Sequence, residues 1–406
     1  MDSFVAWMSF SESERRRVMD AIDTLRQKDA RDELGLGAIR DGFADLFFPG
    51  TGTVQTRARY FLFVPWIYRD LEAKGKDPAE VPRLARDMEL GLIDALEAGG
   101  ETEGVIGVVA RRRLKRLPSN IYWLGMQRWR ISSYVGGQDD FHRFLRRRRN
   151  PVDLLRNDDG EALEDGRNGS WHGGLPPKPP DFPKKASFAL TRREAEYLQE
   201  RILTTSPGTL LSFLVREDGP WEPVGYPWEH PSFGALPVEL QELLRQARRF
   251  SEAMHGAAIL YNLLLAEDAK NEDVETFKEW LGEWATERRK ETAPWPGEWL
   301  DASFWAAATR TGRAIGPRTR AFVREWIGHV SEVAKGGDPG SKAARALVKT
   351  RELEVKGPRR ARLHNESARM LWNGAAGLAR IEYRWTNAQR VLLDIQQGLS
   401  GRASHA

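Results

Sequence analysis

Basic side chains gather in one part of the sequence, with aromatic side chains between them. Residues 105–150 contain twelve Lys and Arg against only Asp139 and Asp140, in a chain whose net charge is +4. Tyr122, Trp123 and Trp129 lie between the basic runs. Cations neutralise phosphates and release counterions, and aromatic rings can stack on bases. This combination predicts contact with nucleic acid, with DNA as the first choice over RNA.

Two shorter segments could also hold a phosphate. The sequence Pro-Gly-Thr-Gly-Thr at 49–53 precedes two Arg, and Gly-rich backbone amides with hydroxyl and guanidinium groups can cradle such an anion. The other segment is a basic loop around Gly357 and Pro358. The predicted nucleic-acid-binding residues are therefore Arg57, Arg59, Arg111, Arg112, Arg113, Lys115, Arg116, Arg128, Arg130, Arg146, Arg147, Arg148, Arg149, Arg359, Arg360 and Arg362.

The same features have structural readings that the sequence leaves open. A run of charge is often a solvated face, with Trp123 and Trp129 in the core, and a basic surface can equally bind an acidic partner protein. The segment 49–53 can be an ordinary tight turn, and loops tolerate charge. Arg clusters without spaced Asn, Gln or Ser give charge rather than base recognition, so we expect contacts mainly to phosphates.

One set of residues could support catalysis. Asp338 precedes Glu354 and Lys356 at a spacing typical of metal-dependent nucleases, in which two acids hold a cation and Lys steadies the developing charge. That chemistry needs the acids on adjacent strands, whereas the residues between them predict a helix. A metal-dependent nuclease that uses carboxylates in 338–356 is therefore the alternative to a non-catalytic protein.

Other classes of site lack their signatures. The sequence contains no Cys, which excludes disulfides, a thiolate nucleophile and Cys-ligated zinc. No two His are four residues apart, and no complete phosphate-loop or dinucleotide-binding signature is present. We expect no catalytic residue, no metal site and no cofactor. The N-terminus does not predict a secretion signal, and no segment reaches the roughly 18 apolar residues of a membrane span, so a cytoplasmic protein without membrane contact is expected.

Apolar periodicity predicts a mainly α-helical fold. The apolar run at 60–66 fits a buried strand or a buried helix, and the residues after it favour a helix. Any β structure is expected in short pieces near 60–66, 105–110 and 211–216. The expected helices cover 12–28, the latter half of 32–48, 79–98, a segment that starts at Pro118-Ser119, 139–149, a segment that starts with the capping box Thr191 to Glu194, a segment after Ser206-Pro207, 237–267, 272–289, 317–334, 339–352, 365–372 and 384–398.

Composition divides the chain into two helical regions. Residues 1–150 form the expected N-terminal helical domain, which includes the basic region 105–150. Residues 151–187 are rich in Gly, acidic residues and Pro, so they predict a linker or a surface arm with little regular structure. Residues 188–406 form the expected C-terminal helical domain.

Three stretches carry a family resemblance. They are LFFPGTGTVQTRARYFLFVPWIY at 46–68, RLPSNIYWLGMQRW at 116–129 and KGPRRARLHNESARMLWNGAAGLARIEYRW at 356–385. Together they resemble a bacterial family of unknown function that spans nearly the whole chain. The family is associated with multi-gene anti-phage defence neighbourhoods that contain helicases, phospholipase-D-like nucleases and methyltransferases. The resemblance implies a component that acts beside DNA-processing enzymes, and it carries over no catalytic residue.

Sequence and resemblance together favour a non-catalytic subunit of a multi-protein defence or DNA-processing complex. The basic region is expected to bind nucleic acid, and the second region is expected to bind partner subunits. A pure protein scaffold that never touches nucleic acid is a further alternative.

Overall fold

The structure is a computed structural model that describes residues 32–74, 77–148, 170–217, 219, 221–290, 299–300 and 302–401. Within the helix at 138–148 the side chains of residues 146–148 are not described. The predicted helix at 12–28 and the acidic part of the segment 151–187 lie outside the described residues.

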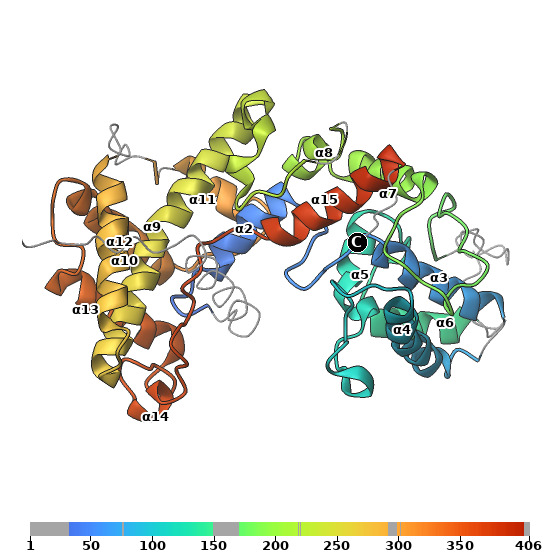
Figure 1. Cartoon of the computed structure of the whole chain (residues 1–406), viewed down its shortest axis with the longest axis horizontal. Helices are drawn as coiled ribbons and strands as arrows, with labels where there is room; N and C mark the ends of the chain where they lie inside the picture. Colours follow the sequence, from blue (N-terminus) through green and yellow to red (C-terminus); the bar gives the residue numbers. More distant parts are fainter. Residues whose placement is uncertain are drawn as a thin grey trace, which may run out of the picture. The chain divides into compact units, whose positions relative to one another are not determined.

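Helices make up most of the described chain, so the mainly α-helical prediction is confirmed (Figure 1). One helix, α11, was not predicted from the sequence. None of the described helices combines the length and apolar character that crossing a membrane requires. The α-helices are α2 (Gly37–Phe47), α3 (Tyr60–Ala73), α4 (Val81–Ala98), α5 (Pro118–Arg128), α6 (Gln138–Arg148), α7 (Arg192–Thr205), α8 (Leu210–Leu214), α9 (Val238–Ala269), α10 (Val274–Lys290), α11 (Ala302–Thr309), α12 (Pro317–Ala334), α13 (Lys342–Lys356), α14 (Glu366–Arg369) and α15 (Trp385–Ser400).

The short β pieces were placed wrongly. Residues 60–66 lie in α3 and residues 211–214 lie in α8, whereas 105–110 form turns. The first nine residues of α3 are all buried, which removes the periodicity that would have distinguished a helix from a strand. Among the described residues, β pairing is confined to an isolated antiparallel bridge between Ser132 and Trp171.

The chain forms two compact units, each built from discontinuous segments. Among the described residues, unit 1 contains those within 32–43 and 241–381, and unit 2 contains those within 44–240 and 382–401. These boundaries do not coincide with the expected ones at residues 150 and 188. The last helix, α15, belongs to unit 2 because it packs against α7 and α8.

Unit 2 is organised around α3, which packs against α4 and α5, and α5 packs in turn against α6. Aromatic rings form much of this core. The Trp129 ring stacks on Phe61 with centroids 4.0 Å apart, and Tyr122 meets Phe61 edge-on at 4.8 Å. The indole of Trp66 donates a hydrogen bond of 2.8 Å to the carbonyl oxygen of Pro176. Large buried rings with satisfied polar atoms of this kind stabilise helix contacts.

Unit 1 is a set of helices around α9. The indoles of Trp284 on α10 and Trp326 on α12 donate hydrogen bonds of 2.8 Å to the backbone carbonyls of Glu252 and Ala253 on α9. Gly256 of α9 allows this close approach, because a Cβ there would lie 2.4 Å from the Trp284 ring. Helices α10 and α13 both pack against α12.

The described part of the Pro-rich segment, residues 170–187, contains no helix and carries only one end of the isolated bridge. It packs on unit 2 through buried side chains. The Phe182 ring stacks on Phe63 at 5.4 Å, and Trp171 is 6% exposed. These residues therefore form an arm fixed to the unit by apolar contacts.

Candidate nucleic-acid interface

Three of the predicted phosphate-binding arginines are engaged in ion pairs inside the fold. The Arg57 guanidinium pairs with Asp394 of α15 at 2.9 Å, and its side chain is 13% exposed. Arg59 pairs with Glu194 of α7 at 2.8 Å and also donates to the carbonyl oxygen of Ser187. Both guanidinium groups are directed at carboxylates of unit 2, so their role in the structure is to join its segments.

Arg362 of unit 1 is also buried, as part of a network of charged groups. It donates from its backbone N–H to Glu352 at 2.8 Å and from its side chain to Glu33 at 3.2 Å. Glu352 also accepts hydrogen bonds from the Tyr261 hydroxyl at 2.6 Å and from Lys356 Nζ at 2.9 Å. Buried carboxylates of this kind are stable only when such donors surround them.

The Gly-Thr segment at 49–53 is a packed turn. Gly50 has φ 89°, and a Cβ there would lie 2.3 Å from the indole nitrogen of Trp129. The backbone N–H groups of Thr51 and Gly52 donate to Phe48 O and to the Gln55 side chain. These two amides are therefore already paired, and they are not available as donors in a phosphate cradle.

The first basic cluster lies in the turn between α4 and α5, which contains the short 3-10 helix η1 (Arg111–Arg113). Arg86 of α4 holds this turn by donating to the carbonyl oxygens of Arg112 and Leu114 at 2.9 and 3.1 Å. Arg111 pairs with Asp94 and Glu97 of α4, at 3.0 and 2.6 Å. The other cations of the cluster are exposed, and no carboxylate in the described chain pairs with them: Arg112, Arg113, Lys115 and Arg116.

The exposed face of α5 continues this surface. Asn120, Leu124 and Arg128 lie four residues apart and are all exposed, so they form one stripe along the helix. Eleven residues of helix span roughly 16 Å. The stripe therefore leads from the first cluster at the N-terminal end of α5 to Arg128 at its C-terminal end.

Arg130 follows α5 and has an unusual backbone conformation, with φ 50°. The next residue, Ile131, is buried and donates its N–H to the carbonyl oxygen of Met126 at 2.8 Å. This is the Schellman arrangement, in which the left-handed position is usually Gly. An Arg at this position lies in a sparsely populated conformation and holds an exposed cation at the end of the helix.

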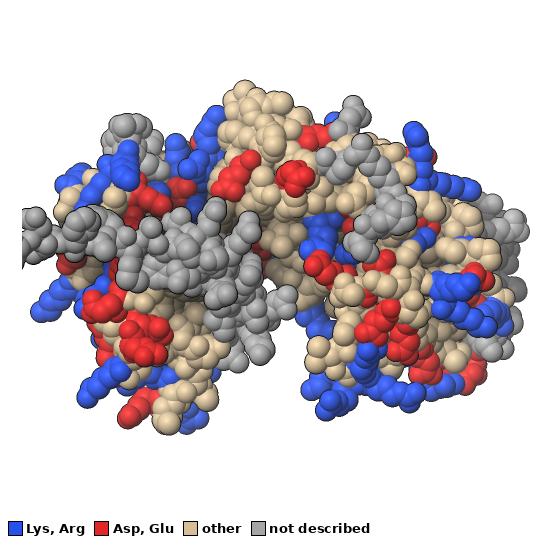
Figure 2. Space-filling model, in the orientation of Figure 1, with Lys and Arg blue, Asp and Glu red and all other residues tan. Residues whose placement is uncertain are grey.

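We name the exposed cations of these two segments the basic ridge: Arg112, Arg113, Lys115, Arg116, Arg128 and Arg130. On the face of unit 2 drawn in Figure 2, Lys and Arg side chains gather at the lower edge, around the turn between α4 and α5. Six cations without carboxylate partners in the described chain create a local positive potential.

The remaining predicted cations are distributed over both units. Arg146, Arg147 and Arg148 lie in the last turn of α6, and Arg149 lies outside the described residues. Arg359 and Arg360 are exposed in the turn after α13, which belongs to unit 1.

The aromatic residues between the basic clusters belong to the core. Tyr122, Trp123 and Trp129 are 0%, 4% and 0% exposed. The indole of Trp123 donates to the carbonyl oxygen of Gly136 at 2.9 Å. These buried rings cannot stack on a base, so they belong to the core and not to a nucleic-acid contact.

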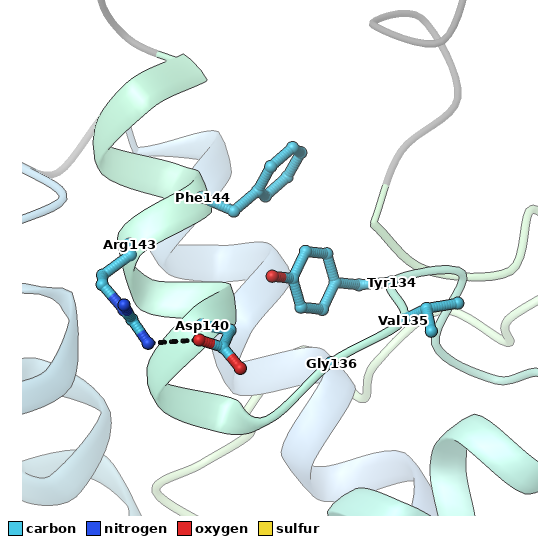
Figure 3. Close-up of a pocket in the computed structure, with 6 residues that line it drawn as sticks. All are labelled: Tyr134, Val135, Gly136, Asp140, Arg143 and Phe144. Carbon is cyan, nitrogen blue, oxygen red and sulfur yellow. Dashed lines mark hydrogen bonds and ion pairs between the residues drawn. The ribbon is translucent and has the colours of Figure 1, made fainter.

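Two other aromatic residues between the basic clusters, Tyr134 and Phe144, are not buried. The loop before α6 and the exposed side of α6 form a hollow of about 300 Å³ (Figure 3). Its two rings, Tyr134 and Phe144, have centroids 5.2 Å apart, and Phe144 is 37% exposed. The sequence did not predict this hollow, and its one signal there is Phe144, two residues before a run of Arg. The hollow is lined by Tyr134, Val135, Gly136, Asp140, Arg143 and Phe144.

The carboxylates of the nuclease alternative lie at opposite ends of α13. Asp338 precedes the first turn and Glu354 lies in the last, so about 18 Å of helix separates them. Lys356 instead pairs with Glu33 and Glu352. Among the described residues, no three His, Asp or Glu side chains are placed to hold a metal ion. This part of the chain does not assemble the cation site that the alternative requires.

One buried carboxylate supports the position of α5. Glu89 of α4 is 1% exposed and accepts a hydrogen bond of 2.8 Å from the backbone N–H of Ser119, in the first turn of α5. A negative group is favourable at a helix N-terminus, where backbone N–H groups lack partners. Burial nevertheless dominates and raises the pKa of Glu89 to about 7, although the hydrogen bonds from Ser119 oppose the shift.

Fold and surface together define an all-helical protein of two compact units, one of which carries an exposed cationic ridge. The chain belongs to a family of unknown function, DUF6361, whose model matches residues 2–398. No curated protein and no solved structure matches the chain.

Proposed function

We propose that this protein is a non-catalytic subunit that binds nucleic acid through phosphates, using the basic ridge of unit 2. The main support is that the predicted cations differ in whether a carboxylate pairs with them. Arg57, Arg59 and Arg111 each face a carboxylate, whereas the six ridge cations are exposed and face none in the described chain. A folded protein leaves several neighbouring cations unpaired at a cost in repulsion, which an anionic partner removes.

The ridge suits a phosphate backbone better than a single small anion. Its two ends are separated by the length of α5, roughly 16 Å. Phosphates of one B-DNA strand recur about every 3.4 Å along the helix axis, so the ridge could follow several of them. All six of its members are Arg or Lys, which favour weakly sequence-selective binding.

We further propose that the protein is part of a multi-subunit anti-phage defence or DNA-processing complex. Support comes from the family resemblance and from exposed apolar residues in unit 1. Met370 and Leu371, after α14, are 81% and 75% exposed. Neighbouring exposed apolar residues are typical of protein contact sites, so they also support the alternative of a pure protein scaffold. Under that alternative, Met370→Glu/Leu371→Glu would abolish complex formation with purified products of neighbouring genes, and no nucleic acid would bind.

A salt titration with a charge-matched control tests the nucleic-acid proposal. Arg112→Gln/Arg113→Gln/Arg116→Gln removes three unpaired cations. The control, Arg83→Gln/Lys185→Gln/Arg192→Gln, removes three exposed cations of unit 2 that pair with Glu80 or Asp87, Asp181 and Glu196. We expect the ridge variant alone to weaken binding to duplex DNA and to flatten the slope of log K against log salt by roughly 2.7. Equal effects of the two variants, or none, would overturn the proposal.

A further inference from the structure

The hollow beside α6 has the properties of a site for one flat, uncharged ring. Tyr134 projects from the loop and Phe144 from the helix toward the same space (Figure 3). The Tyr134 ring is supported from behind by Phe141, at 5.2 Å between centroids, and Phe141 is fully buried. The ring of Phe144 is partly exposed at the rim. An aromatic surface that is fixed on one side and open on the other suits stacking by a further ring.

The charges in the hollow cancel one another. Arg143 pairs with Asp140, the only acidic side chain among the lining residues. A phosphate would meet the Asp140 carboxylate as well as the guanidinium, so the hollow is less favourable for an anion than the basic ridge is. Hydrogen-bonding capacity remains, because the Tyr134 hydroxyl makes no hydrogen bond within the described chain. The exocyclic amino and carbonyl groups of a base can use such donors and acceptors.

The hollow is attached by hydrogen bonds to α5, whose C-terminal end carries Arg128 of the ridge. Gln127 of α5 donates hydrogen bonds to the carbonyl oxygens of Tyr134 and Gly136. Trp123, also of α5, donates to the same carbonyl of Gly136 at 2.9 Å. Arg128 directly follows Gln127, so the last turn of α5 carries both a cation of the ridge and the side chain that holds the wall of the hollow. A strand held by its phosphates on the ridge would have its bases within reach of the hollow.

We propose that an unpaired nucleobase stacks on Tyr134 and Phe144 while its strand lies on the basic ridge, so that the protein prefers single-stranded nucleic acid to duplex. This inference rests on the proposed function. A base within a duplex has both faces covered by its neighbours and cannot enter the hollow without unstacking. The stacking contact is sequence-tolerant, because every base presents an aromatic face.

Replacement of Phe144 tests the inference. The ligands are single-stranded DNA, single-stranded RNA and duplex DNA of roughly 12 nucleotides, and affinities are measured by fluorescence anisotropy. Phe144→Ala should weaken binding of a single strand by about 5- to 150-fold and leave duplex binding unchanged. Phe144→Tyr, which keeps a ring, should restore it, whereas Phe144→Leu should not. The matched control is Val238→Ala at the start of α9, since Val238 is 73% exposed and lies outside both the hollow and the basic ridge.

A base analogue whose fluorescence falls on stacking gives a second readout. Its emission should be quenched on binding to the wild-type protein and not on binding to Phe144→Ala, with helicity of both proteins compared by circular dichroism. Equal losses for single strands and duplex, no loss for either, or full rescue by Phe144→Leu would overturn the inference and leave the proposed function standing. A protein that binds an acidic peptide through Phe144 but no nucleic acid would overturn both.

Discussion

The Arg57 side chain forms two short contacts with the carboxylate of Asp394, from Nε at 3.0 Å and from Nη2 at 2.9 Å. Asp394 also accepts the backbone N–H of Ala58 at 2.8 Å. The pair joins the residues just before α3 to α15, near the other end of the chain, within unit 2. Burial raises the pKa of Asp394 and the Arg57 guanidinium opposes that shift, so the carboxylate depends on this partner for its charge.

Arg57→Gln should lower the free energy of unfolding by about 3–5 kcal/mol, because it leaves the Asp394 carboxylate buried without its cation. Urea unfolding measures the loss, with Arg112→Gln as an exposed control that should change stability by less than about 0.5 kcal/mol. Arg57→Gln/Asp394→Asn should recover part of the loss. An Arg57→Gln variant as stable as the control would show that the pair contributes nothing to the fold.

Arg130→Gly should stabilise the protein and weaken its binding to nucleic acid. Gly adopts φ near 50° without the cost of about 1 kcal/mol or more that a side chain incurs there. The same change removes one cation of the ridge and should flatten the salt slope by about 0.9. Thermal unfolding measures the change in stability, and a salt titration on the same preparation measures the change in slope. Unchanged affinity would remove Arg130 from the ridge, even if the stability rises as expected.

Ionisation of Glu89 should lower the free energy of unfolding as pH rises. Its pKa is about 7 in the fold against an ordinary value of 4.5, so the folded state holds the proton more tightly. The resulting stabilisation is complete below pH 4.5 and is lost as pH rises to about 7, by at most about 1.4 kcal/mol per pH unit. Glu89→Gln should abolish this part of the pH dependence, as measured by urea unfolding between pH 5 and 8, roughly. Parallel stability profiles for the two proteins would contradict the raised pKa.

Arg146→Gln/Arg147→Gln/Arg148→Gln/Arg149→Gln should weaken nucleic-acid binding alike across all sequences. These cations end α6 and continue past it, and they should add phosphate contacts that carry no base recognition. The salt slope should flatten by at most about 3.6. Anisotropy titrations with several unrelated sequences provide the measurement. A loss confined to one sequence would indicate base recognition instead of phosphate contact.

The purified protein alone should show no divalent-ion-dependent cleavage of DNA. Asp338 and Glu354 are separated by the length of α13, and Lys356 is engaged by Glu33 and Glu352. Incubation of supercoiled plasmid with Mg²⁺ or Mn²⁺ tests the expectation. Nicking that needs the metal and disappears in Glu354→Ala would instead establish the nuclease alternative.

The sequence by itself determined the features whose causes are local. The capping box of α7 forms as predicted, with Thr191 Oγ1 accepting from the Glu194 N–H and Glu194 accepting from the Thr191 N–H. Helix α12 begins at Pro317 and ends at Ala334, which are the predicted bounds. Capping and apolar periodicity act over a few residues, so the order of residues contains the information. Helix α11 was not predicted because it has only eight residues and follows a segment that contains Pro294 and Pro296.

Tertiary structure alone decided which cations face solvent. Arg57 and Arg112 look equally available in the sequence, but one meets Asp394 and the other meets no carboxylate in the described chain. Likewise Trp123 and Phe144 are both aromatic residues near Arg, but only Phe144 reaches the surface. Pairing and burial depend on residues far away in the chain, brought close by the packing of whole helices. No local pattern records those distances, so the ridge and the hollow became visible only in the folded chain.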